Sequence, residues 1–182
     1  MYMRKIAFLF PVLVFLFSLS SCEDVLDDLT KFTVKDTSTV SIPATTVIEL
    51  PITIATPEIE IDLSEEFDNN NSNKDLIESA KLQKMSFVVK SPSTGSFDFL
   101  NSVELYIEVE GEEKVLLASI YDIPEEQLTT INLDVTDLEL KPYLTKDNYT
   151  ISGKIKIDKT NEAEYEIDIN SEFLIDAKIL GI

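Results

Sequence analysis

The sequence predicts an all-β protein, a single antiparallel β-sandwich of immunoglobulin-like or Greek-key type that follows a signal peptide and a short tether. Short apolar segments rich in Val, Ile and Thr recur from about residue 39 onward, and β-branched residues favour strands. Several segments alternate apolar and polar residues with a period of two, as half-buried strands do. Turn-forming clusters separate the segments at the short intervals that are typical of sandwiches.

The first 21 residues have the layout of a bacterial secretory signal. Arg4 and Lys5 form a positive segment, and an apolar run follows over residues 6–17, broken only by Pro11. This run is shorter than the roughly 20 residues that a membrane-spanning helix needs. We therefore expect residues 1–21 to be a cleaved signal peptide.

The tetrapeptide Leu19-Ser20-Ser21-Cys22 resembles the lipobox of bacterial lipoproteins. The resemblance implies transfer of a diacylglyceryl group to Cys22, cleavage before it and acylation of its new amino group. Two or three acyl chains anchor a protein stably, whereas one chain binds only marginally. The alternative is an ordinary signal peptide with a coincidental cysteine. Cys22 is the only cysteine in the chain, which excludes an intrachain disulfide and a cysteine metal site.

Residues 22–37 are predicted to be the lipidated cysteine and an acidic tether, and residues 38–182 the sandwich domain. The residues just after Cys22 are acidic, namely Glu23, Asp24, Asp27 and Asp28. They resemble the tether of Bacteroidota lipoproteins that are sent to the cell surface, and the alternative is a solvated linker that is merely acidic. We expect the protein at the cell envelope, on the outer membrane. Whether the domain faces the exterior or the periplasm stays open.

The composition of the mature chain excludes several functions. Without Arg4 and Lys5, 13 lysines oppose 34 acidic residues, a formal charge of −21, and Arg, His and Trp are absent. Without histidine, neither a Ser-His-Asp nor a Cys-His arrangement can be built. Without arginine, no guanidinium can clamp a phosphate, and the negative charge repels nucleic acid. The sequence predicts a protein that is not an enzyme, with no cofactor and no nucleic-acid partner.

The elements follow in chain order. Strands are predicted over residues 40–42, 47–54, 59–63, 82–90, 97–109, 115–121, 131–135, 151–157, 165–169 and 173–179. Proline residues punctuate the first three, which should therefore be edge strands, bent strands or strand ends. A polar loop is expected at residues 68–73 and a single helical turn at 74–80, the only helix expected in the domain. Residues 138–144 should form a crossover that Pro142 interrupts.

The clearest strand lies between a break near Asn101 and a turn at Gly111. Its apolar face holds Val103, Leu105, Ile107 and Val109, and its polar face holds Glu104, Tyr106, Glu108 and Glu110. This strand should be half buried.

Residues 151–157 and 165–169 are predicted to pair as a hairpin whose turn centres near Thr160. The matching register sets Lys156 opposite Glu164, Lys154 opposite Glu166 and Ile155 opposite Tyr165. A one-residue slip would place charges on the apolar face, whereas a two-residue slip would satisfy both faces and stays open.

Three predicted strands carry acidic rows on one face: Glu58-Glu60-Asp62, Glu104-Glu108-Glu110 and Glu164-Glu166-Asp168. Paired carboxylates suit glycoside hydrolysis, and acidic clusters can hold Ca²⁺. We favour a solvated outer face that discourages edge-to-edge association.

The polar segment Asp68–Asn73 partly matches an EF-hand loop through Asp68, Asn70 and Ser72. The match fails where the loop needs glycine and a final glutamate, because these positions hold Asn73 and Ser79. An ordinary loop is the better interpretation.

Four tyrosines lie on an outward face or near predicted strand ends, at positions 106, 121, 143 and 149. They could contact a sugar or a protein partner, although core or rim positions are the more common alternative.

These observations favour a membrane-anchored binding or accessory module without catalytic activity. Its partners would be the lipid bilayer, through acylated Cys22, and an envelope protein or a glycan. The alternative is a structural, pilin-like subunit whose last strand, Phe173–Ile179, completes a neighbour's sheet. A hydrolase that depends on Ca²⁺ or on carboxylates alone is less favoured.

Overall fold

The computed structural model describes residues 30–46, 51–60 and 64–178. Cys22, the signal segment and the acidic residues at positions 23, 24, 27 and 28 lie outside these ranges. The predicted strands that reach residues 47–50, 61–63 and 179 are described only in part.

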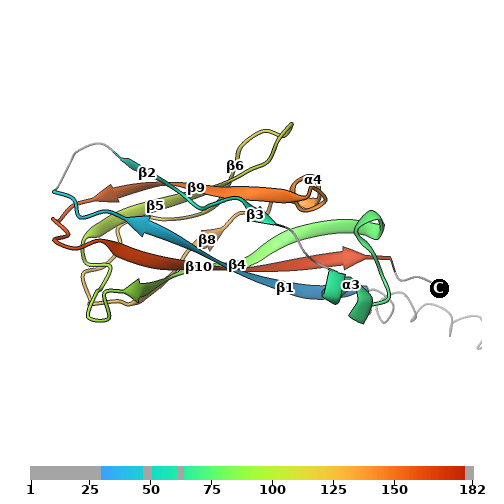
Figure 1. Cartoon of the computed structure of the whole chain (residues 1–182), viewed down its shortest axis with the longest axis horizontal. Coiled ribbons are helices and arrows are strands. Elements are labelled where there is room, and N and C mark those ends of the chain that lie inside the picture. Colours follow the sequence, from blue (N-terminus) through green and yellow to red (C-terminus); the bar gives the residue numbers. More distant parts are fainter. Residues whose placement is uncertain (1–29, 47–50, 61–63, 179–182) are drawn as a thin grey trace, which may run out of the picture.

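Two antiparallel sheets pack face to face (Figure 1). The four-stranded sheet has the order β1 (Lys31–Ile42), β10 (Tyr165–Ala177), β4 (Ile77–Ser91) and β7 (Thr130–Asn132). The six-stranded sheet has the order β2 (Ile52–Ala55), β9 (Asn148–Ile157), β5 (Leu100–Glu108), β6 (Val115–Ile120) and β8 (Asp134–Val135), and β3 (Ile59–Glu60) also pairs with β9. The predicted antiparallel β-sandwich is confirmed.

One hydrophobic core fills the space between the sheets. Phe87 and Phe173 enter it from the four-stranded sheet and Leu105 and Ile151 from the six-stranded sheet, all nearly inaccessible to solvent. The alternation predicted for β5 is confirmed, since Val103, Leu105 and Ile107 are buried while Glu104, Tyr106 and Glu108 are partly exposed.

The strand order contains a Greek key. Strands β5, β6, β8 and β9 follow one another within the six-stranded sheet, and β9 returns to lie beside β5. The predicted strand 131–135 is divided between the sheets, because β7 belongs to one and β8 to the other. Leu133, between them, is buried.

The predicted tether extends too far, because β1 begins at Lys31 and pairs with β10 along its length. Phe32, Val34, Val40 and Ile42 share the inward face of β1, and Asp36 and Ser38 occupy the two inward positions between them. These two polar residues interrupt the apolar period, which is why the segment looked like a polar tether.

The predicted hairpin between residues 151–157 and 165–169 is wrong. β9 and β10 lie in different sheets, and residues 158–164 cross from one sheet to the other. Lys154 therefore lies opposite Glu104 on β5 rather than opposite Glu166. Alternation reports only which side chains are buried, and both strands of such a crossing turn their apolar faces into the same core.

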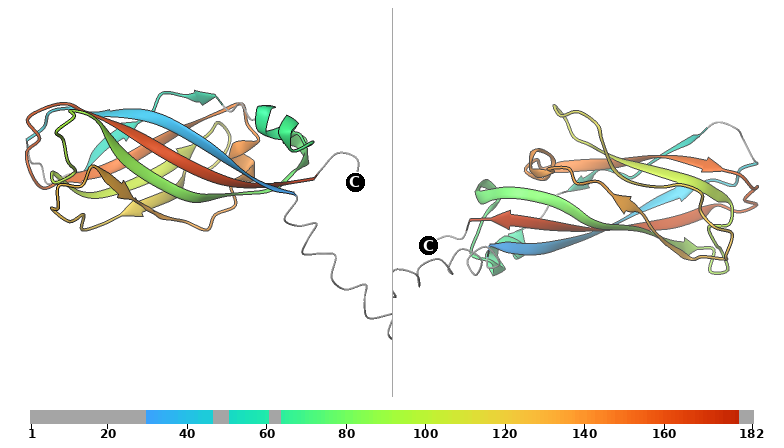
Figure 2. Two further views of the ribbon diagram at one scale, coloured as in Figure 1. Left: turned by 90° about the horizontal axis from the view of Figure 1, so that it is seen from below. Right: turned by 180° about the vertical axis from the view of Figure 1, so that it is seen from behind.

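The predicted strands 165–169 and 173–179 form one strand, β10. It lies between β1 and β4 and pairs with both (Figure 2). With both edges occupied, this strand is not free to complete a neighbour's sheet, which removes the structural basis of the pilin-like alternative.

The helical predictions were partly wrong. A 3₁₀ turn, η1 (Lys74–Leu76), replaces the expected turn at 74–80, and residues 77–80 begin β4. A further helix, α3 (Ser64–Asn69), includes part of the expected polar loop. The crossover at 138–144 ends in α4 (Lys141–Leu144), with Pro142 in its first turn, a position that proline favours.

The two ends of the sandwich differ. One end carries α3, α4, the start of β1 and the end of β10, and the connection between β9 and β10 lies at the other end (Figure 1).

Candidate functional site

The four-stranded sheet carries a hollow on its outer face. Its lining includes a row of four uncharged polar residues, one on each strand: Thr37 on β1, Asn170 on β10, Ser86 on β4 and Asn132 on β7. We call this row the polar hollow. The charged residues Lys35, Asp36, Lys84 and Glu172 also line the depression. The pairing registers place each residue of the row directly beside the next. The hollow has a volume of about 310 Å³, at the lower end of the range for ligand sites.

Most hydrogen-bonding groups of the polar hollow are available to a ligand. Thr37 donates its hydroxyl to Oδ1 of Asn170 at 2.8 Å, which fixes the amide of Asn170. Within the described residues, no other protein group bonds to the hydroxyl of Ser86, the amide of Asn132 or Nδ2 of Asn170.

Ion pairs flank the polar hollow on both sides. On one side, the carboxylate of Glu172 lies 3.7 Å from the ammonium of Lys35 and 3.1 Å from that of Lys84. On the other side, Asp168 accepts the hydroxyl of Thr39 at 2.7 Å and lies 3.5 Å from the ammonium of Lys90. These pairs neutralise the acids nearest to the row.

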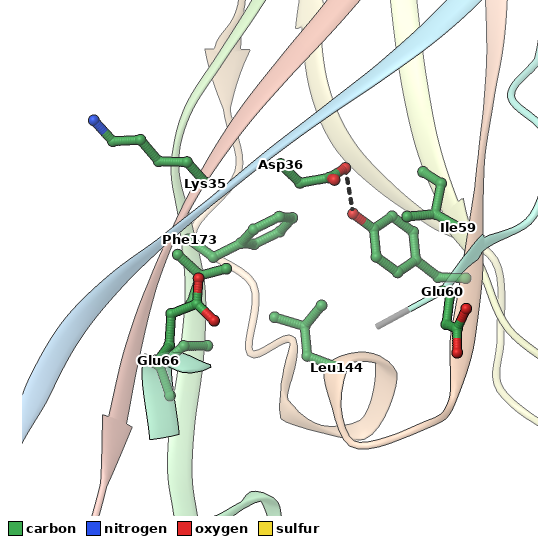
Figure 3. A pocket seen from close by; sticks show the side chains of 10 residues that line it. Lys35, Asp36, Ile59, Glu60, Glu66, Leu144 and Phe173 are labelled. Atoms are coloured by element: carbon green, nitrogen blue, oxygen red, sulfur yellow. Dashed lines mark hydrogen bonds between the residues drawn. The ribbon is translucent and has the colours of Figure 1, made fainter. Parts of the chain in front are cut away.

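A second feature is the edge crevice, a gap between the open edges of the two sheets (Figure 3). Its main lining residues are Val34, Asp36, Ile59, Leu144, Tyr149 and Phe173. Asp36 points into the crevice, while Lys35 points away from it. The volume is about 70 Å³, room for a few water molecules but not for a sugar ring or a peptide.

The edge crevice encloses a buried hydrogen bond. The hydroxyl of Tyr149 donates to Oδ2 of Asp36 at 3.0 Å. Burial raises the pKa of Tyr149, and the negative charge of Asp36 raises that pKa further, so the hydroxyl remains a donor near neutral pH. Ser38 and Ser171 occupy inward positions beside Asp36, and their buried hydroxyls have no partner among the described residues. Ordered water is the usual partner of such groups.

A third feature is the tyrosine cluster on the outer face of the six-stranded sheet. The carboxylate of Glu104 accepts hydroxyl hydrogen bonds from Tyr106 at 2.7 Å and from Tyr121 at 2.8 Å. The ammonium groups of Lys114 and Lys154 lie 5.0 and 5.5 Å from the centre of the Tyr106 ring, within the range of a cation–π contact.

Hydrogen bonding shifts the ionisation of this cluster. The bonds from Tyr106 and Tyr121 lower the pKa of Glu104, and the bond to Glu104 raises the pKa of Tyr106 to about 12. The neighbouring Glu108 accepts hydrogen bonds from Lys114 and Ser152, which lower its pKa as well. The hydrogen-bonding groups of the cluster are bonded to one another, so few of them are left to bind a ligand.

A fourth depression, of about 180 Å³, lies between loops at the end opposite α3 and includes Asp98 and Asn161. Asn161 uses its side chain to hold these loops, donating to the carbonyls of Pro43 and Ala163 and accepting from the amide of Thr45. Asp98 accepts from the amide of Gln127. The side chains of Asn161 and Asp98 are therefore engaged in holding the loops.

The acidic rows do not converge into one site. Glu60 lies on β3, Glu104 on β5 and Asp168 on β10, so the rows occupy different strands of two sheets, and Asp62 lies outside the described residues. Within the described ranges, no group of three acidic residues is placed to hold a metal ion. Asp168 and Glu104 instead accept hydrogen bonds from neighbouring side chains.

The residues that partly match an EF-hand loop have structural roles instead. Asp68 lies within α3, Ser72 is buried and donates to the carbonyl of Lys178, and Asn73 caps η1 by accepting from the amide of Asp75. These groups stabilise local structure.

The four tyrosines singled out in the sequence fall into two groups. Tyr143 and Tyr149 are buried, as the alternative held. Tyr121 is 57% exposed and Tyr106 partly exposed. The polar hollow was not predicted from the sequence, because its four residues lie on four different strands and share no local pattern.

No described helix is long and apolar enough to cross a membrane.

Comparisons with known proteins assign no family to this chain. No protein-family model and no curated protein matches the chain. Among solved structures, the capsid of Helicobacter pylori bacteriophage KHP30 is similar at 8% identity and a TM-score of 0.38, over 81% of this chain and 94% of that chain. Desmodium yellow mottle tymovirus is similar at 9% identity and a TM-score of 0.30, over 84% and 91%. A carbohydrate-binding module of the β-sandwich superfamily is similar at 11% identity and a TM-score of 0.31, over 81% of this chain but 55% of that chain.

Proposed function

We propose that this protein is a non-enzymatic binding module, held at the cell envelope by a lipid on Cys22, that takes its ligand on the outer face of the four-stranded sheet. The observation that carries the proposal is the polar hollow, a row of available donors and acceptors in a depression on a rigid sheet. Sites built on strands are held more firmly than sites on loops.

The absence of histidine supports a role without catalysis, because the chain contains no side chain that titrates near neutral pH without a shifted pKa. The acids with lowered pKa, Glu104 and Glu108, are held by their neighbours as ionised acceptors. A general acid near neutral pH needs the opposite shift.

The lipid anchor is supported by the N-terminal sequence, in which the positive segment, the apolar run and Leu19-Ser20-Ser21-Cys22 follow one another. It is tested by expressing the full chain with Cys22→Ala beside a Ser18→Ala control, with radiolabelled palmitate in the medium. We expect label and membrane association in the wild type and in Ser18→Ala, and loss of both in Cys22→Ala. Equal labelling of the three chains would overturn the anchor.

The side of the membrane is tested by protease treatment of intact cells. Digestion with a periplasmic marker spared places the domain outside, and protection until the outer membrane is opened places it in the periplasm. The non-enzymatic role is tested by incubating the purified protein with any ligand it binds. Turnover that is lost in Glu104→Gln or Glu108→Gln would refute it.

A further inference from the structure

The polar hollow has the shape of a transverse track. Neighbouring strands lie about 4.8 Å apart, so a row across four strands is about 14 Å long. Register places Thr37 beside Asn170, Asn170 beside Ser86 and Ser86 beside Asn132. The row thus runs perpendicular to the strands and is long enough for more than one sugar ring.

The chemistry of the row is that of amides and hydroxyls. An amide offers donors and an acceptor side by side, and a serine hydroxyl offers both. Each hydroxyl of a sugar is likewise a donor and an acceptor. The free groups of Ser86, Asn132 and Asn170 therefore complement a ligand that presents several hydroxyls along its length.

The charge around the row indicates a neutral ligand. The whole chain carries a formal charge of −19, yet the row has no charged member, and lysines face the acids that flank it. The strong negative charge of the protein repels anionic chains. A cationic ligand would have to compete with lysines for carboxylates that are already paired, such as Glu172, whose side chain is 20% exposed.

The position of the row argues against an extended peptide. A peptide gains affinity by adding a strand to an open sheet edge, where main-chain groups are unpaired. The polar hollow lies on the face of the sheet, where the main chains of β10 and β4 are already paired with one another.

From these observations we infer that the polar hollow binds a neutral, polyhydroxylated chain, an uncharged oligosaccharide, that lies across the strands in contact with Ser86, Asn132 and Asn170. This inference rests on the proposed function and assigns its ligand class.

The test is affinity electrophoresis of the mature lipoprotein in a non-ionic polyoxyethylene detergent. Native gels each contain one neutral polysaccharide, namely mixed-linkage glucan, xylan, mannan or pullulan, and a further gel contains polygalacturonate as an anionic contrast. We expect slower migration in at least one neutral gel and unchanged migration in polygalacturonate.

Variants locate the binding surface. Ser86→Ala and Asn132→Ala each remove hydrogen-bonding groups and should weaken the apparent Kd about fivefold to tenfold, since one net hydrogen bond contributes about 1 kcal/mol. Asn148→Ala is the matched control, because Asn148 lies on the outer face of the other sheet, and its Kd should not change. Asn132 is exposed, so its variant keeps the folded state, which a thermal melt verifies.

Three results would overturn the inference: no retardation in any neutral gel, retardation in polygalacturonate alone, or equal loss in Asn132→Ala and Asn148→Ala. Its failure is distinguishable from that of the proposed function. If the protein carries a lipid and lacks catalytic activity but is not retarded in any neutral gel, only the ligand class is refuted. If the protein is retarded but carries no lipid, only the anchor is refuted.

Discussion

The hydroxyl of Tyr149 donates a hydrogen bond to Asp36 at 3.0 Å, and this bond joins the two sheets of the sandwich. Tyr149 belongs to β9 of the six-stranded sheet and Asp36 to β1, an edge of the four-stranded sheet. Asp36 occupies a position where the strand pattern calls for an apolar residue, and the tyrosine compensates for that placement.

Replacing Tyr149 by Phe should lower the free energy of unfolding by about 1–3 kcal/mol, because the partly buried carboxylate of Asp36 loses its donor. Urea denaturation near neutral pH measures the change. Tyr121→Phe is the control, since its hydroxyl belongs to an exposed side chain and its loss should change stability by less than about 0.5 kcal/mol. Equal effects of the two variants would contradict a structural role for the buried bond.

Glu104 should stabilise the fold at neutral pH and less in acid. Its folded-state pKa lies below the ordinary 4.5 because Tyr106 and Tyr121 donate to it. The stabilisation is complete above about 4.5 and is lost as the pH falls through the lowered folded-state value. The destabilisation caused by Glu104→Gln, measured with urea, should therefore shrink between about pH 7 and about pH 3. Glu110→Gln removes the same charge from an exposed side chain and should show no such trend.

Tyr106 should ionise at a higher pH than an ordinary tyrosine. Its pKa is raised from 10.0 to about 12 by the hydrogen bond to Glu104, so its contribution to stability is complete below pH 10 and is lost as the pH rises through about 12. Phenolate absorbance, compared with that of Tyr106→Phe, identifies its titration. Glu104→Gln should move this pKa toward 10.0, whereas Glu110→Gln should leave it in place. A Tyr106 pKa that is the same in both variants would rule out the carboxylate as the cause.

Lys154 should couple to Glu104 and not to Glu166. Lys154 lies opposite Glu104 across β9 and β5, while Glu166 lies on the other sheet. A double-mutant cycle of Lys154→Ala with Glu104→Ala should give a coupling energy of about 0.2–1 kcal/mol. The same cycle with Glu166→Ala is the control and should give a value near zero. The reverse result would restore the hairpin that the sequence suggests.

Properties that depend on near neighbours in the chain could be predicted from the sequence. Alternation identified the buried face of β5 correctly, because Val103, Leu105 and Ile107 recur at every second position. It failed in β1, where Asp36 and Ser38 face inward. The β9–β10 pairing failed because two strands of opposite sheets show the same alternation as two strands of one hairpin.

The candidate site could not be predicted because its residues meet only through pairing. Thr37 and Asn170 are 133 positions apart and form a hydrogen bond, and each of the four residues of the polar hollow lies on a different strand. The sequence contains no information on register between distant strands, and the predicted tether even includes Thr37. The acidic rows were visible because the residues of each row are close together in the sequence, and for the same reason they were a poor indicator of a site.

The pairing of β1 with β10 has a consequence for how the protein is made. In the described chain, β1 is the first strand to leave the ribosome and β10 the last, and β1 pairs within its sheet with β10 alone. The four-stranded sheet therefore cannot close before β10 has been synthesised, and such distant pairing is slow even then. Until β10 has been made, the nascent chain lacks the partner strand of β1 and so cannot reach its final tertiary structure.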